Sequence, residues 1–238
     1  MPTNISWTDE TWNPVTGCTP ISEGCANCYD RDVAHSRLRD KYVDGFGVIT
    51  EHENRLLNPI VWAKKPRKIF VGSMTDLFHD QVSDEFLEKI LNVIKSNPQH
   101  VFQLLTKRAC NLNRIKNYPH NVWLGVTIEN NRNLIRLEYL TKTNAKVKFV
   151  SAEPLLEPFS DLTWLRDVDW IIVGGESGPR YRPFNSEWAR QIREMCRNYG
   201  TAFWFKQAAG IKPRKTLDGQ TVQEWPSCWP KKPQLDLF

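Results

Sequence analysis

Three cysteines lie close together near the N-terminus, at Cys18, Cys25 and Cys28. They are half of the six cysteines in the chain and fall within eleven residues. Three thiolates can hold three irons of a four-iron, four-sulfur cluster and leave the fourth iron open to bind and activate a ligand. The spacing therefore indicates metal chemistry, with an iron-sulfur cluster as the first candidate.

Two other uses of these cysteines stay open at the level of sequence. A structural zinc ion would take a fourth Cys or His ligand, and the candidates are His35, His52, Cys110, Cys196 and Cys228. Disulfide bonds would need an oxidising compartment. We expect a cytoplasmic protein, because the N-terminus lacks a signal-peptide pattern and no apolar run approaches the roughly 18 to 20 residues that span a bilayer.

The composition is that of a folded globular protein. The 238 residues are 40% apolar and 25% charged, which is ordinary for a globular domain, and the length fits a single α/β barrel. The net charge of +5 is compatible with a solvated surface and equally with a nucleic-acid partner. Composition alone does not choose between these partners.

The elements that must position the cysteines are predicted from apolar runs. Short β-branched or aromatic runs recur with helical patterns between several of them, which is typical of parallel βαβ units. A first short strand is predicted around 11–15, before the cysteines, and the others at 68–72, 101–105, 122–126, 147–150, 170–173 and 202–205. Helices are predicted from Ser83 to Ile94, Asn131 to Thr141 and Ser186 to Asn198, the last ending at Gly200.

Polar residues follow each predicted strand. In a barrel of parallel strands the carboxyl ends meet on one face, where active sites are built. The cysteine loop follows the first strand, so it should open on this same face. Loops are polar in most proteins, but here a charged residue follows nearly every strand end, including Asp76, Lys107, Glu129, Glu153, Glu176 and Lys206.

The chain resembles the radical S-adenosylmethionine (radical SAM) enzymes, which carry three cluster cysteines after the first strand of a full or partial barrel. It is most similar to a family of phage and bacterial proteins of unassigned function, and more distantly to spore photoproduct lyase-type enzymes. The usual superfamily spacing is C-x3-C-x2-C, whereas this chain has C-x6-C-x2-C. The motifs that carry the resemblance are WNPVTGC (12–18), GCANCY (24–29), SMTDLFH (73–79), LTKR (105–108) and GGESGP (174–179).

The resemblance implies a fold and two cofactors. The fold is a partial TIM-like (β/α)6-7 barrel with the cysteine loop after the first strand, spanning 1–211, with 30–67 as a possible lid and 212–238 as a C-terminal extension. The cofactors are a [4Fe-4S] cluster on the three cysteines and S-adenosylmethionine, which together generate a 5′-deoxyadenosyl radical. The reaction, the substrate and the external electron donor are not specified by this resemblance.

The resemblance also implies roles for the strand-end residues. Ser73, Thr75 and Asp76 would meet the methionine ammonium, and Lys107 or Arg108 its carboxylate. Gly174 and Gly175 would allow close approach of the adenosine or substrate, or would form only a tight turn. Glu129, Glu153 and Glu176 would line the barrel mouth and orient a substrate or the ribose hydroxyls.

Two further interpretations are kept beside this one. The chain could be a zinc-stabilised nucleic-acid-binding module that uses basic and aromatic residues of its C-terminal half, or a barrel that has lost its chemistry. A nucleic acid or nucleobase is also possible as the substrate of an enzyme. The residues of the binding-module interpretation are Arg180, Arg182, Lys212, Arg214, Lys215, Trp225 and Trp229.

Overall fold

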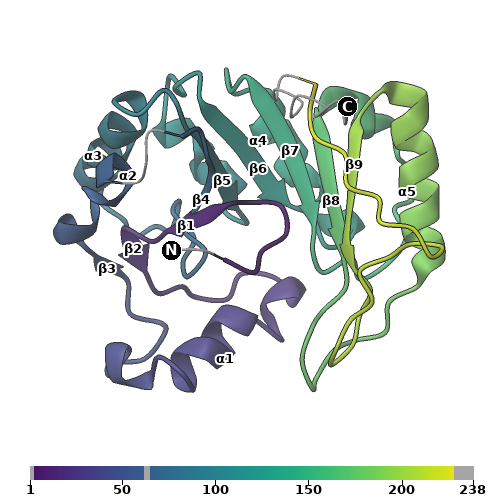
Figure 1. Cartoon of the computed structure of the whole chain (residues 1–238), viewed down its shortest axis with the longest axis horizontal. Helices are drawn as coiled ribbons and strands as arrows, with labels where there is room; N and C mark the ends of the chain where they lie inside the picture. Colours follow the sequence, from purple (N-terminus) through teal and green to yellow (C-terminus); the bar gives the residue numbers. More distant parts are fainter. Residues whose placement is uncertain (1–2, 62–64, 228–238) are drawn as a thin grey trace, which may run out of the picture.

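The central element is one curled sheet of seven parallel strands, open at both edges (Figure 1). The computed structural model describes residues 3–61 and 65–227. All neighbouring strands run parallel, and their order across the sheet is their order in the chain. The strands are β1 (Glu10–Trp12), β4 (Lys68–Val71), β5 (Val101–Thr106), β6 (Val122–Thr127), β7 (Val147–Ala152), β8 (Trp170–Gly174) and β9 (Ala202–Gln207). The predicted partial TIM-like α/β barrel is confirmed.

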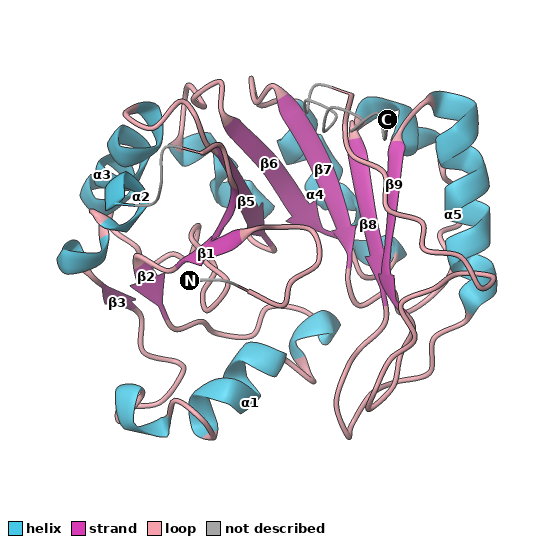
Figure 2. Cartoon of the chain, in the orientation of Figure 1, coloured by secondary structure: helices cyan, strands magenta, loops and turns pink. Residues whose placement is uncertain are grey.

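Helices cover the outer face of this half-barrel (Figure 2). They are α3 (Asp84–Lys95), α4 (Ile135–Thr141) and α5 (Ser186–Tyr199), close to the predicted ranges. Helix α3 begins where Ser83 accepts a hydrogen bond from the Phe86 amide at 3.1 Å, and α5 ends at Gly200, whose φ is 73°. A 3-10 turn, Asn131–Leu134, precedes α4.

The inner face of the half-barrel is filled with aromatic side chains. Alternate residues of each strand point to opposite faces, so β8 sends Ile171 and Val173 toward the helices and Trp170 and Ile172 inward. Trp170 lies 5.5 Å from Phe149 between ring centroids. The inner cluster also contains Trp7, Phe70, Trp123 and Trp204. These rings fill the inner face in the amino-terminal part of the half-barrel.

The segment predicted as a possible lid packs against the cysteine loop. It contains α1 (Tyr29–His35), β3 (Thr50–Glu51) and α2 (Asn58–Val61). Strand β3 pairs antiparallel with β2 (Val15–Thr16), a short strand that the sequence analysis did not predict. Ala34 and Phe46 of this segment are buried against Met74, beside Cys18 and Cys28. The segment therefore forms a wall next to the loop.

The described part of the C-terminal extension pairs with β9. The Phe205 amide donates to the Val222 carbonyl at 2.8 Å, and Trp225 packs among inner tryptophans with its ring centroid 4.7 Å from that of Trp204. Trp225 is therefore partly buried against the inner cluster, and its use as a surface for nucleic-acid bases stays a prediction. Trp229 lies outside the described residues. Within the described residues, no helix is both long and apolar enough to cross a membrane.

A methyl group at Gly125 should destabilise the fold. A Cβ atom there would lie 2.5 Å from the ring of Phe149 on the neighbouring strand, so Gly125→Ala should lower the free energy of unfolding by about 1–3 kcal/mol through overpacking. Urea unfolding measures this change. Gly47→Ala is the matched control, because no atom lies within 4 Å of its added Cβ. If both substitutions change the free energy of unfolding equally, the close contact is contradicted. Adding Phe149→Leu to Gly125→Ala should restore part of the lost stability, because it removes the ring that the added methyl group meets.

Candidate functional site

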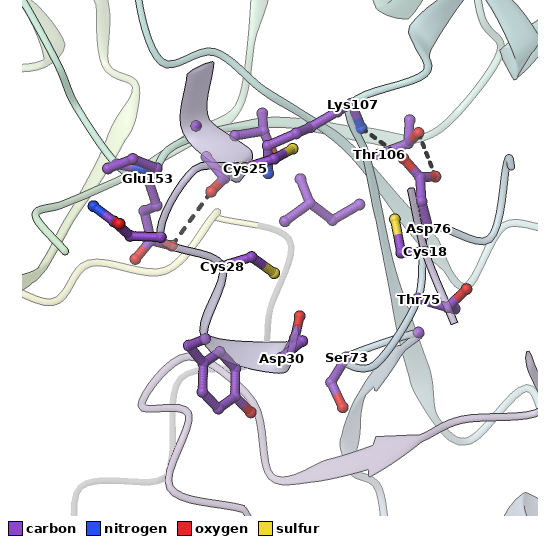
Figure 3. Close-up of a pocket in the computed structure, with 18 of the residues that line it drawn as sticks. Cys18, Cys25, Cys28, Asp30, Ser73, Thr75, Asp76, Thr106, Lys107 and Glu153 are labelled. Carbon is purple, nitrogen blue, oxygen red and sulfur yellow. Dashed lines mark hydrogen bonds between the residues drawn. The ribbon is translucent and has the colours of Figure 1, made fainter. Parts of the chain in front are cut away.

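A cavity of about 260 Å³ lies at the carboxyl ends of the strands. The cysteine loop forms one part of its wall and the strand ends form the other. Figure 3 shows Cys18 on one side and Cys25 and Cys28 on the other. The predicted residues that line the cavity are Cys18, Cys25, Cys28, Ser73, Thr75, Asp76, Lys107, Glu153, Gly175 and Glu176, whereas Glu129 and Gly174 do not line it.

The start of the cysteine loop is fixed by backbone contacts. Gly17 has a φ of 94°, which favours glycine, and a Cβ there would lie 2.0 Å from the Val48 carbonyl oxygen. The Thr75 hydroxyl donates to the Gly17 carbonyl at 2.6 Å, and the Cys18 amide donates to the Phe46 carbonyl at 2.8 Å. Thr75, predicted to meet a cofactor ammonium, thus also holds the cysteine loop to the end of β4.

Glu129, which follows β6, anchors the middle of the cysteine loop. Its side chain is fully buried and accepts hydrogen bonds from the Ser22 hydroxyl at 2.5 Å and from Arg136 at 2.7 Å. Gly24 packs so closely on it that a Cβ would lie 2.4 Å from the carboxylate. The prediction that Glu129 lines the barrel mouth is therefore wrong, because the loop covers it.

Glu176 anchors the end of the loop. Its carboxylate accepts hydrogen bonds from the Asn27 side-chain amide at 3.0 Å and from the Arg182 backbone amide at 2.7 Å, and it forms an ion pair with the Arg182 guanidinium. Burial acts to raise the pKa of Glu176, but the hydrogen bonds from Arg182 and Asn27 outweigh it and lower the pKa. Glu176 therefore stays ionised and joins the loop to the end of β8.

Asp76 and Arg108 form a buried network beside Cys18. The Asp76 carboxylate accepts from the Phe78 amide at 3.1 Å, the Thr106 hydroxyl at 2.6 Å, the Lys107 amide at 3.1 Å and Arg108 at 3.4 Å. The Arg108 guanidinium also donates to the Thr19 carbonyl at 3.0 Å and lies 3.8 Å from the Cys18 sulfur. Both Asp76 oxygens are thus occupied by the chain itself.

The two glycines after β8 allow close packing. A Cβ on Gly174 would lie 2.9 Å from the Glu153 carboxylate, and one on Gly175 would lie 2.6 Å from the Ala209 amide nitrogen. The Gly175 amide donates to the Gln207 carbonyl at 2.9 Å. Backbone packing therefore requires glycine at 175, whether or not a ligand approaches it, whereas at 174 an added Cβ would meet only the end of the flexible Glu153 side chain.

Two lysines border the cavity. The Lys206 ammonium forms an ion pair with Glu153 at 2.9 Å. Lys107 also borders the cavity, and its charge acts on Cys25 and Cys28. The Ser73 hydroxyl, also at the cavity, accepts a hydrogen bond from the Asn13 side-chain amide at 3.0 Å and donates to the Asn13 side-chain oxygen at 3.3 Å.

The three thiols differ in acidity. Burial and the nearby Asp76 charge raise the pKa of Cys18 to about 11, and burial also raises the pKa of Cys28. Burial acts on Cys25 in the same direction, but the positive charge of Lys107 and hydrogen bonds within the loop outweigh it and lower the pKa. Cys25 is the thiol that is most readily deprotonated for metal binding.

Asp30 is a cavity residue that the sequence analysis missed. It follows Cys28 by two residues and lies in the first turn of α1 (Figure 3). Burial raises the pKa of its carboxyl group to about 7, against the opposing charges of Lys107 and Lys206. The available signal in the sequence was its position two residues after Cys28. That signal is weak, because carboxylates are common in the first turn of helices, where they stabilise the helix N-terminus.

The remaining zinc-ligand candidates do not complete a site. Among the described residues, no three or more His, Cys, Asp or Glu side chains are arranged to hold a single metal ion. Cys196 is buried in the outer core and Cys110 is exposed, while Cys228 lies outside the described residues. The three loop cysteines are free thiols.

The comparisons with known proteins identify a family and a fold. The family described as "Protein of unknown function (DUF5131)" matches residues 2–226, and no curated protein matches the chain. A cysteine-to-serine mutant of spore photoproduct lyase has a TM-score of 0.50 at 12% identity, covering 84% of this chain and 75% of that one. A cysteine-to-alanine mutant of the same enzyme, with dinucleoside spore photoproduct, has a TM-score of 0.50 at 12% identity, covering 83% and 74%. At this identity the likeness concerns the fold, a half-barrel of parallel strands.

Removing the charge of Glu129 should loosen the cysteine loop. Glu129→Gln leaves the buried Arg136 guanidinium without its counter-charge, which should lower the free energy of unfolding by roughly 3 kcal/mol, as measured by chemical unfolding. Glu138→Gln on the exposed side of α4 is the control. Adding Arg136→Met to Glu129→Gln should restore part of the stability, and a single variant as stable as wild type would show that the pair does not hold the loop.

Proposed function

The chain belongs to the DUF5131 family, whose function is unknown, and from that premise we propose that it is a radical SAM enzyme. In this proposal Cys18, Cys25 and Cys28 hold a [4Fe-4S] cluster and the adjacent cavity holds S-adenosylmethionine. One observation carries the proposal: three free cysteines of one loop border a shared cavity at the carboxyl edge of a parallel half-barrel. The spore photoproduct lyase structures support it at the level of fold.

The donor set fits a cluster better than a single ion. One zinc ion needs its ligands to meet at one point, and no three metal-binding side chains in the described part of the chain do so. A cubane cluster takes each thiolate on a different iron, so ligands on opposite sides of a cavity suit it. The two buried carboxylates Glu129 and Glu176 hold the loop in this shape before any metal binds.

When bound, a reduced cluster with S-adenosylmethionine supplies a 5′-deoxyadenosyl radical, which abstracts a hydrogen atom from a substrate. The chain positions the reactants and excludes water. We assign Lys107 to the methionine carboxylate rather than Arg108, because Arg108 is held by Thr19 and Asp76. Ser73 and Gly175 border the space for the cofactor. Glu153, paired with Lys206, is available to the ribose hydroxyls or to a substrate.

Metal content and S-adenosylmethionine cleavage test the proposal. Anaerobic reconstitution with iron and sulfide should give a protein with about four irons and broad visible absorbance, both lost in the triple variant Cys18→Ala/Cys25→Ala/Cys28→Ala. Dithionite, standing in for the external electron donor, should then release 5′-deoxyadenosine from S-adenosylmethionine. Cys110→Ala is the control, because this exposed cysteine lies outside the cavity.

Other outcomes would select the alternative interpretations. One zinc and no iron per chain would reject the cluster and favour a zinc-stabilised binding module. A complete cluster that yields no 5′-deoxyadenosine with several reductants would indicate a barrel that has lost its chemistry.

We propose further that the substrate is a nucleic acid. One of the similar structures holds dinucleoside spore photoproduct, and arginines from separate segments surround the cysteine loop. Arg132 pairs with Glu23 and is 83% exposed, and Arg180 pairs with Asp32 and is 62% exposed. Arg31 and Arg182 donate to loop carbonyls, and the exposed Tyr29 and Tyr181 lie in the same two segments. Arginine and tyrosine side chains around a loop that borders the cavity suit phosphates and bases.

The salt dependence of binding tests this substrate class. The reconstituted protein should bind a fluorescent single-stranded oligonucleotide with an affinity that falls as salt rises. In Arg132→Gln/Arg180→Gln the slope of log affinity against log salt should be shallower, by the amount expected for the loss of about one to two phosphate contacts. Arg197→Gln is the control. Arg197 is as exposed as Arg180, at 62%, but it lies in the last turn of α5 and does not contact the cysteine loop among the described residues. No binding at low salt, or an equal effect of the control, would argue against a nucleic-acid substrate.

A further inference from the structure

Asp30 presents an unpartnered buried oxygen to the cavity. Its residue lines the cavity beside Cys28, and the Oδ1 atom is buried with no hydrogen-bond partner in the described part of the chain. A buried carboxylate oxygen without a partner is unfavourable, because desolvation is not offset by any hydrogen bond. Such an atom in a cavity is suited to a ligand that brings a donor.

The neighbouring cations do not satisfy this oxygen. Lys206 is committed to Glu153 at 2.9 Å, and no ion pair between Asp30 and Lys107 is found among the described residues. Lys107 acts on Asp30 only through its charge. In the described part of the chain, no hydrogen bond or ion pair occupies the Lys107 ammonium either. Figure 3 shows the two residues at different ends of the cavity.

This arrangement offers one negative and one positive group to the same ligand. An α-amino acid group carries an ammonium and a carboxylate on one carbon, so it complements a carboxylate and a lysine that face it from two sides. A ligand ammonium would also compensate a carboxylate that otherwise adds negative charge beside three thiolates. The structure therefore selects a zwitterionic ligand end at this place.

We propose that Asp30 accepts a hydrogen bond from the α-ammonium of S-adenosylmethionine, with Lys107 facing the α-carboxylate. This inference rests on the proposed function and changes its residue assignment. Asp76, which the sequence indicated for the ammonium, has both oxygens occupied by Phe78, Thr106, Lys107 and Arg108. Asp30, by contrast, borders the cavity with its Oδ1 atom buried and without a hydrogen-bond partner in the described part of the chain.

Two adenosine ligands distinguish this role from a structural one. S-adenosylhomocysteine carries the amino-acid end and 5′-methylthioadenosine lacks it. In titration calorimetry with the reconstituted protein, Asp30→Asn should weaken S-adenosylhomocysteine binding roughly tenfold or more and leave 5′-methylthioadenosine binding unchanged. Asp40→Asn, which changes an aspartate that is 96% exposed, should alter neither affinity.

Thermal unfolding of the ligand-free protein provides a second measurement. Because the Asp30 Oδ1 atom has no hydrogen-bond partner in the described part of the chain, Asp30→Asn removes no native hydrogen bond at that atom, and the midpoint should equal or exceed that of wild type. Equal loss of both ligands, or a lower midpoint, would overturn the inference in favour of a structural role. Unchanged S-adenosylhomocysteine binding in Asp30→Asn would overturn it while the proposed function stands. A wild-type protein with a complete cluster that binds neither ligand would overturn both proposals.

Discussion

The anchoring of the cysteine loop by two buried carboxylates is the constraint on which the site depends. Glu129 holds the Ser22 hydroxyl at 2.5 Å and Glu176 holds the Asn27 amide at 3.0 Å. Each carboxylate is compensated by an arginine, Arg136 or Arg182. Buried charges persist only when they are paired and hydrogen-bonded, so these pairs belong to the folded framework. The loop between them has little freedom to change shape.

The cavity that the cysteines border lies at the carboxyl end of the half-barrel. The inner tryptophan and phenylalanine rings pack against one another through the amino-terminal part of the sheet, and this packing stabilises a sheet that does not close on itself. At the carboxyl ends the inward positions change from aromatic to polar, for example from Trp204 to Lys206 along β9. The chain thus separates stability from function along the strand direction, as parallel barrels generally do.

The polar groups at the cavity fall into two classes that the sequence does not distinguish. Asp76, Glu129 and Glu176 are engaged by the chain itself and give the loop and strand ends their shape. Asp30 and Lys107 border the cavity and keep capacity for a ligand. Residues of both classes lie a few positions after a strand end or a cysteine. Proximity to a strand end therefore predicted where these charges lie, but not whether they pair within the chain or bind a ligand.

The sequence by itself determined the parallel sheet, the approximate positions of its seven strands and the place of Cys18, Cys25 and Cys28 after the first of them. These depend on local apolar periodicity and on the rule that parallel strands end on one face. The tertiary structure alone decided which charges pair and which face the cavity. Ser22 and Glu129 are 107 residues apart in the chain, and Asn27 and Glu176 are 149 apart. A carboxylate is available to a ligand only if folding brings it no partner, and that depends on every segment packed around it.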